Sequence, residues 1–181
     1  MDSDFSKQIF ELQEKVKYLE TGTENKISMI VFSGELDKLL ASFVLATGAA
    51  SMDMNVVMFF TFWGTPALRN KKKKVSGKDF FSKMFGLMLP KGTGKLKLSK
   101  LNMAGMGTIM MKSLMKKKKV ASVEEMLELS GNLGIQIYIC EMSMKLMGLQ
   151  RDEMMDYPHL KYCGVATFLA EAQNSKIQLF I

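Results

Sequence analysis

The chain has 181 residues, 48% hydrophobic and 24% charged, which fits one globular domain with an appendage. Its two cysteines are too few for a disulfide scaffold, and the sequence shows no charged-then-apolar leader. The longest uncharged stretches are shorter than the roughly 20 residues that a membrane-crossing helix needs. We therefore expect a cytoplasmic protein whose thiols are reduced. The net charge of +7 is unevenly distributed: residues 69–119, here called the basic window, hold 16 of the 25 basic and one of the 18 acidic residues.

The first predicted element is an amphipathic helix within residues 1–22. Its apolar residues recur at spacings of four, three, four and three, and they are Phe5, Ile9, Leu12, Val16 and Leu19. These residues form an apolar seam along one side of the helix, and such a seam needs a partner surface to cover it. We expect it to dock on the chain's own domain or on a second subunit.

From residue 26 the pattern changes to alternating strands and helices. Strands are predicted at 27–32, 54–60, 135–139, around Tyr162 and at 177–181, with helices at 35–51, 123–132 and 165–174 and with Ser122 as the cap of the second of these helices. This alternation predicts an α/β domain over residues 26–181, with a parallel sheet covered by helices on both faces. Parallel sheets bind ligands beyond the C-terminal ends of their strands, so Cys140 lies at the functional edge.

The basic window interrupts this domain with two lysine runs. They consist of Lys71, Lys72, Lys73, Lys74, Lys116, Lys117, Lys118 and Lys119. Between them, residues 80–89 and 102–115 carry apolar side chains at helical spacing. We expect this insertion to dock on an anionic membrane surface, to bind a partner protein, or to cover the chain's own sheet edge. Nucleic acid is disfavoured, because nearly all cations are lysines and no RNA-binding signature is present.

A helical turn is predicted directly after Cys140. Amides at its start would point toward the sulfur and lower the thiol pKa from about 8.5, although the Glu141 carboxylate would oppose this effect if it pointed inward. A buried, inert cysteine is the alternative interpretation. Among the methionines that follow, Met142, Met144 and Met147 are better explained by core packing than by a role in excluding water from the thiol.

Other kinds of site find little support in the sequence. His159 is the single histidine and has no cysteine or histidine at metal-binding spacing, so we expect no metal. No G-x-G-x-x-G or Walker motif is present, so we expect no cofactor.

Three segments together resemble the DsrE/DsrF-like family: C-E-M-S-M-K-L-M-G-L at 140–149, G-V-A-T-F-L at 164–169 and N-M-A-G-M-G-T at 102–108. They are similar to its larger branch with a basic, Met-rich insertion, often labelled peroxiredoxin-like. The resemblance implies a flavodoxin-like α/β fold, oligomers, sulfur donor and acceptor proteins as partners, and a strand-end cysteine that carries sulfane sulfur as a persulfide. Cys140 stands at that position.

Cys163 departs from the family pattern, because relatives tend to have glycine at its place between Tyr162 and Gly164. Its strand ends at the same sheet edge as Cys140, so the two sulfurs could lie close enough for a disulfide, which needs Cα atoms about 4.4 to 6.8 Å apart. An incidental small residue is the alternative interpretation.

We therefore expect a cytoplasmic, oligomeric sulfur carrier or sulfurtransferase with an accessible, low-pKa thiol at Cys140. Peroxidase chemistry is disfavoured, because residues 132–139 lack the Pro and Thr context of a peroxide-reducing cysteine. The alternative function is a non-catalytic adaptor that docks on a membrane or a protein and in which Cys140 is structural.

Overall fold

The computed structural model describes residues 2–21, 24–73 and 80–181. Its strands are β1 (Glu24–Val31), β2 (Asn55–Phe60), β3 (Gln136–Cys140), β4 (Leu160–Cys163) and β5 (Ser175–Phe180). Its α-helices are α1 (Asp2–Thr21), α2 (Leu36–Ala50), α3 (Phe80–Met88), α4 (Met106–Lys117), α5 (Val123–Asn132), α6 (Glu141–Leu146) and α7 (Val165–Gln173). Short 3-10 helices are η1 (Phe62–Leu68), η2 (Thr93–Lys95), η3 (Met103–Gly105) and η4 (Arg151–Glu153).

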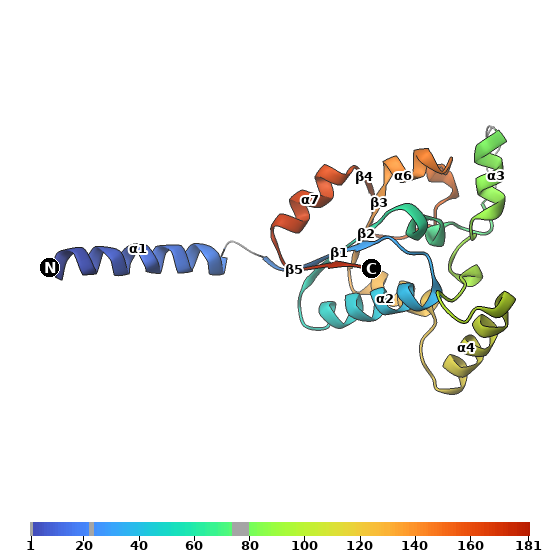
Figure 1. The fold of residues 1–181 in the computed structure, drawn as a ribbon, viewed down its shortest axis with the longest axis horizontal. Coiled ribbons are helices and arrows are strands. Elements are labelled where there is room, and N and C mark those ends of the chain that lie inside the picture. The colour runs from blue at the N-terminus through green and yellow to red at the C-terminus, as the bar shows by residue number, and fades with distance from the viewer. Residues whose placement is uncertain (1, 22–23, 74–79) are drawn as a thin grey trace.

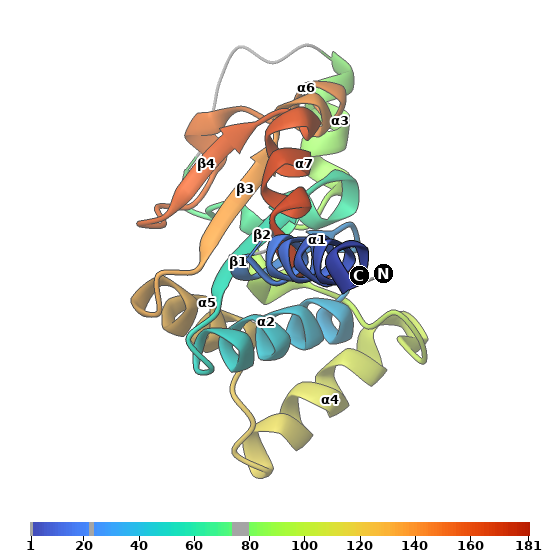
Figure 2. The ribbon, with the colours of Figure 1, turned by 90° about the vertical axis from the view of Figure 1, so that its left-hand side faces the viewer.

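Within the described residues, five strands form one sheet in the order β4-β3-β2-β1-β5, and each neighbouring pair is parallel. The chain steps from β1 to β4 in one direction and then crosses back to β5. Because such crossovers are right-handed, α2 and α5 cover one face, whereas α7 covers the other (Figures 1 and 2). The predicted α/β architecture is therefore confirmed.

Side chains alternate between two separate cores along β3. Ile137 and Ile139 join the larger core beneath α2 and α5, whereas Tyr138 and Cys140 join a smaller cluster beneath α7. The smaller cluster also contains Cys163. Cys140 therefore belongs to the face that a single crossover helix covers.

The start of α5 follows the prediction closely. Ser122 forms a capping box, in which its hydroxyl accepts a hydrogen bond from the Glu125 amide at 3.2 Å while the Glu125 carboxylate accepts one from the Ser122 amide at 2.7 Å. This cap fixes where the chain returns from the basic window to the sheet.

The described part of the basic window contains the two predicted helices, α3 and α4, at the end of the molecule opposite α1 (Figure 1). A buried ion pair ties its first residue to the domain, since Arg69 Nη2 lies 2.9 Å from Glu153 Oε2 and Arg69 Nη1 donates to the Gly86 carbonyl at 3.2 Å. Arg69 is thus a structural cation. Lys74 lies outside the described residues.

The α1 helix extends away from the sheet (Figure 1). Its seam residues Phe5, Ile9, Leu12 and Val16 are exposed, whereas the side chain of Leu19 lies outside the described part. The described seam is therefore not packed on the chain's own domain, which leaves a second subunit as the expected partner.

The Arg69–Glu153 pair predicts a large stability effect. Arg69→Met should lower the free energy of unfolding by about 3–5 kcal/mol, because the buried Glu153 carboxylate loses its cation. Denaturant titration measures this change. Lys38→Met, which breaks the exposed Lys38–Glu35 pair, is the matched control and should cost less than about 1 kcal/mol. Equal costs for both variants would contradict the anchoring role of Arg69.

Candidate functional site

The carboxyl ends of β2, β3 and β4 meet at one edge of the sheet. Cys140 is the last residue of β3 and lies in register with Cys163, the last residue of β4. Thr61 follows β2 directly and is buried. The predicted location of Cys140 at the strand end is confirmed, and the parallel register brings the two cysteines together.

Hydrogen-bond donors surround the Cys140 sulfur. The Met142 and Ser143 amides at the start of α6 point toward it, and the Ser143 and Thr61 hydroxyls approach it from the side. These two hydroxyl oxygens lie 2.7 Å apart. Because each hydroxyl has one proton, one hydroxyl donates to the other, which in turn donates to the sulfur.

These donors set the ionisation of the thiol. Burial alone would raise the pKa of Cys140, but the Ser143 and Met142 amides and the linked Ser143 and Thr61 hydroxyls favour the thiolate more strongly. The net result is a Cys140 pKa below the ordinary value. This direction agrees with the one that the sequence led us to expect.

The Glu141 carboxylate has a cationic partner of its own. It pairs with the Arg151 guanidinium, whose carbon also lies 4.7 Å from the centre of the Tyr162 ring. Met144 and Met147 are buried in the larger core, as expected, whereas Met142 is exposed.

Cys163 has the opposite ionisation behaviour. Burial, followed by the negative charges of Cys140 and two nearby glutamates, raises its pKa to about 11. Both cysteines are free. The site therefore pairs a thiol whose pKa is lowered with one that stays protonated near neutral pH.

Access to the site is restricted. Cys140 is 2% exposed, so it is not the accessible thiol that the sequence led us to expect, and Cys163 is 9% exposed. The reason is that both side chains point into the cluster beneath α7. A reactant must be small, or the residues over the sulfur must move.

A polar network anchors α7 to the sheet beside the cysteines. The Tyr138 hydroxyl donates to Glu171 Oε1 at 2.6 Å, and Lys26 forms an ion pair with the same carboxylate. Lys161 Nζ lies 5.2 Å from the centre of the Tyr138 ring. This network holds the helix that covers the two thiols.

Thr61 and Ser143 were not identified from the sequence as residues of the site. Each offered a signal, since Thr61 directly follows an apolar run and Ser143 lies three residues after Cys140 at the start of a helix. What the sequence did not provide was the β2–β3 pairing that places the first hydroxyl beside the second.

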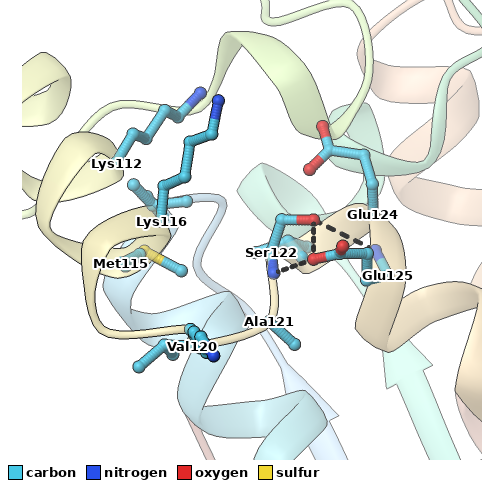
Figure 3. A pocket seen from close by; sticks show the side chains of 11 residues that line it. Lys112, Met115, Lys116, Val120, Ala121, Ser122, Glu124 and Glu125 are labelled. Carbon is cyan, nitrogen blue, oxygen red and sulfur yellow. Dashed lines mark hydrogen bonds between the residues drawn. The ribbon is translucent and has the colours of Figure 1, made fainter.

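The second lysine run lies away from the cysteine site. It borders a hollow of about 590 Å³ between α4 and α5. Lys112 and Lys116 stand on one side of this hollow, and Glu124 stands on the other (Figure 3). A larger hollow of about 1020 Å³ lies at the carboxyl ends of β1 and β5 and is lined by Trp63, Phe180 and lysines of the basic window.

In the described ranges 2–21, 24–73 and 80–181, no group of three or more His, Cys, Asp or Glu side chains is arranged to hold a metal ion. No helix there combines the length and apolar character needed to cross a bilayer.

The donors around Cys140 predict a measurable pH effect. Ser143→Ala removes a hydroxyl that favours the thiolate, so it should raise the pKa of Cys140 and slow its alkylation by iodoacetamide near neutral pH. Alkylation rates measured against pH give the midpoint. Ser130→Ala, which removes an equally buried hydroxyl that donates to the Met126 carbonyl instead, should leave the midpoint unchanged. An unshifted midpoint in Ser143→Ala would exclude this hydroxyl as a stabiliser.

The sequence and fold are similar to those of proteins already known. YrkE of Bacillus subtilis strain 168, an uncharacterized protein, is 41% identical over 161 residues, which cover 89% of this chain and 99% of that protein. The sulfur carrier protein DsrE2 of Allochromatium vinosum is 35% identical over 162 residues, covering 87% and 99%.

Among solved structures, the ychN protein of E. coli matches with a TM-score of 0.53 at 11% identity, over 86% of this chain and 98% of that chain, which supports the flavodoxin-like fold class. The model of the DsrE/DsrF/DrsH-like family matches residues 23–180, the whole α/β domain with the cysteine edge and the basic window. With this match and two relatives aligned over nearly their full length, the chain belongs to the DsrE/DsrF/DrsH-like family.

Proposed function

We propose that this protein is a sulfur-relay carrier that holds sulfane sulfur as a persulfide on Cys140. One observation carries the proposal: a thiol with a lowered pKa lies at the carboxyl end of a central parallel strand, surrounded by hydrogen-bond donors. Membership of the family and the relative named as a sulfur carrier support a sulfur-relay role. Cys140 is the position that the family resemblance assigns to sulfur.

The loading step needs no cofactor. The Cys140 thiolate attacks the outer sulfur of a donor persulfide, the bond between the two donor sulfurs breaks, and the donor leaves as a thiolate. The product is a persulfide anion at the place where the thiolate stood. The amides of Met142 and Ser143 can stabilise this new charge as they stabilise the original one.

Donor and acceptor proteins are the partners that this chemistry requires. Since Cys140 is almost fully buried, a protein donor has to displace the residues that cover it. A small polysulfide can reach the thiol with less displacement. We place this activity in the cytoplasm, where thiols stay reduced. The exposed α1 seam suits association with a second copy.

Sulfur loading can be tested by intact-protein mass spectrometry after incubation with polysulfide. The wild type should gain the mass of one sulfur, and dithiothreitol should remove it. Cys140→Ser should show no gain, whereas Cys163→Ser keeps the reactive thiol and should still be loaded. A reduced, folded sample that takes up no sulfur on Cys140 would refute the carrier function.

We propose that the basic window is a docking element for an anionic membrane surface. The outward face of α4 favours this function, because Met106, Ile109, Met110 and Leu114 form one exposed apolar stripe that ends at Lys117. Such a helix can bury its apolar face at the headgroups while lysines contact the phosphates. If Cys140 proves purely structural, this surface leaves a membrane or protein adaptor as the second candidate function.

Vesicle flotation tests the membrane proposal. Replacing Lys116, Lys117, Lys118 and Lys119 by glutamine should weaken binding to vesicles rich in phosphatidylserine by roughly a thousandfold, since each cation near the surface contributes about 1 kcal/mol. Glutamine at Lys7, Lys15, Lys145 and Lys176 removes the same charge elsewhere and should have much less effect. Equal losses would show that net charge alone drives binding, and no binding by the wild type would favour a protein partner.

A further inference from the structure

The pairing of Cys140 with Cys163 suggests more than a carrier with one thiol. Both cysteines are the last residues of adjacent parallel strands, and they are register partners. Both side chains join the cluster beneath α7, so they point to the same face of the sheet. In a parallel pair, such partners are as close as two residues on different strands can be.

Their separation is compatible with a covalent bond. Neighbouring strands lie about 4.8 Å apart, which falls within the Cα separations of about 4.4 to 6.8 Å found across disulfides. The space beside Cys163 is also open, since a Cβ added to Gly164, the next residue, would meet nothing within 4 Å. The register and the strand spacing therefore allow a bond between the two sulfurs.

The two thiols also differ in the way that a two-step reaction requires. Hydrogen-bond donors surround Cys140 and favour its anion, whereas nearby negative charges and burial keep Cys163 protonated. Sulfur should therefore load on Cys140, and Cys163 should remain a thiol beside it. This difference distinguishes a first reactive thiol from a second, resolving one.

We propose that Cys163 resolves the Cys140 persulfide, releasing its outer sulfur as hydrosulfide and closing a Cys140–Cys163 disulfide. This inference rests on the proposed persulfide carrier and adds an activity to it, the reductive release of sulfur. Cys163 is thereby a catalytic residue of the release step, because its sulfur forms the new bond.

The step is balanced in atoms and electrons. Cys163 Sγ attacks Cys140 Sγ, the bond between Cys140 Sγ and the outer sulfur breaks, and that sulfur leaves with the electron pair of the bond. The thiol proton of Cys163 moves to the leaving sulfur, so the persulfide anion plus the thiol gives the disulfide plus HS⁻. The outer sulfur is reduced, and the two cysteines supply the two electrons. A cellular thiol or dithiol can then reduce the disulfide and restore the dithiol form.

Release of the outer sulfur as hydrosulfide competes with its transfer to an acceptor protein. The restricted access to Cys140 favours release. An acceptor has to displace the cover above a sulfur that is 2% exposed, whereas Cys163 already lies beside it. A loaded protein without an acceptor should therefore discharge on its own. The internal disulfide then leaves no free thiol to accept more sulfur until it has been reduced.

The test follows a single discharge of the full chain. Protein loaded with polysulfide is desalted in the absence of oxygen and alkylated at intervals. Its intact mass is then measured by mass spectrometry without reductant. Hydrosulfide released into the solution is trapped with monobromobimane. In the wild type, the species heavier by one sulfur should convert to one that is two hydrogens lighter than the dithiol, with one hydrosulfide per disulfide. In Cys163→Ser and Cys163→Ala the persulfide should persist at least about tenfold longer, because the adjacent attacking thiol is absent.

Each other outcome has a definite meaning. A wild-type persulfide that decays no faster than in the Cys163 variants, with no lighter species, overturns the release step and leaves the carrier intact. If Cys140 takes up no sulfur, the carrier and the release step both fail. If the variants do not fold, as circular dichroism would show, peptide mapping of the wild type still decides: a Cys140–Cys163 peptide that forms with hydrosulfide supports the proposal, and its absence refutes it.

Discussion

Parallel strand pairing builds the site around the two cysteines. Because β2, β3 and β4 run in the same direction, their carboxyl ends reach one edge of the sheet, and the register there places Cys140 beside Cys163. The same pairing brings the residue after β2, Thr61, to the loop that begins α6. Residues separated by up to 102 positions, from 61 to 163, thus meet in one site.

Burial and hydrogen bonding act against each other on the central thiol. Burial disfavours the Cys140 thiolate, yet it also excludes the water that would compete with the surrounding hydroxyl and amide donors. The donors prevail, which lowers the pKa. Cys163 is buried without comparable donors and next to negative charge, so its pKa rises. Two identical side chains in one cluster therefore acquire different chemistry from their surroundings.

The basic window remains tied to this site although its charge is very different. The buried Arg69–Glu153 pair joins the window's first residue to the segment after α6, and Arg69 also holds α3 through the Gly86 carbonyl. The segment after α6 and the α3 helix of the window therefore share one anchor. The window is therefore fixed to the domain at its first residue.

The types of most elements, the parallel α/β class, the Ser122 cap and the strand-end place of Cys140 could be predicted from the sequence, because they follow from local periodicity and from residues close in the chain. The burial of Cys140, the structural role of Arg69 and the hydrogen bond between Thr61 and Ser143 became visible only in the fold. These properties depend on which strands become neighbours and which helix covers each face. Contacts between distant segments leave no periodic signal in a single sequence, so the environment that sets the chemistry of the two thiols emerges only when the sheet is assembled.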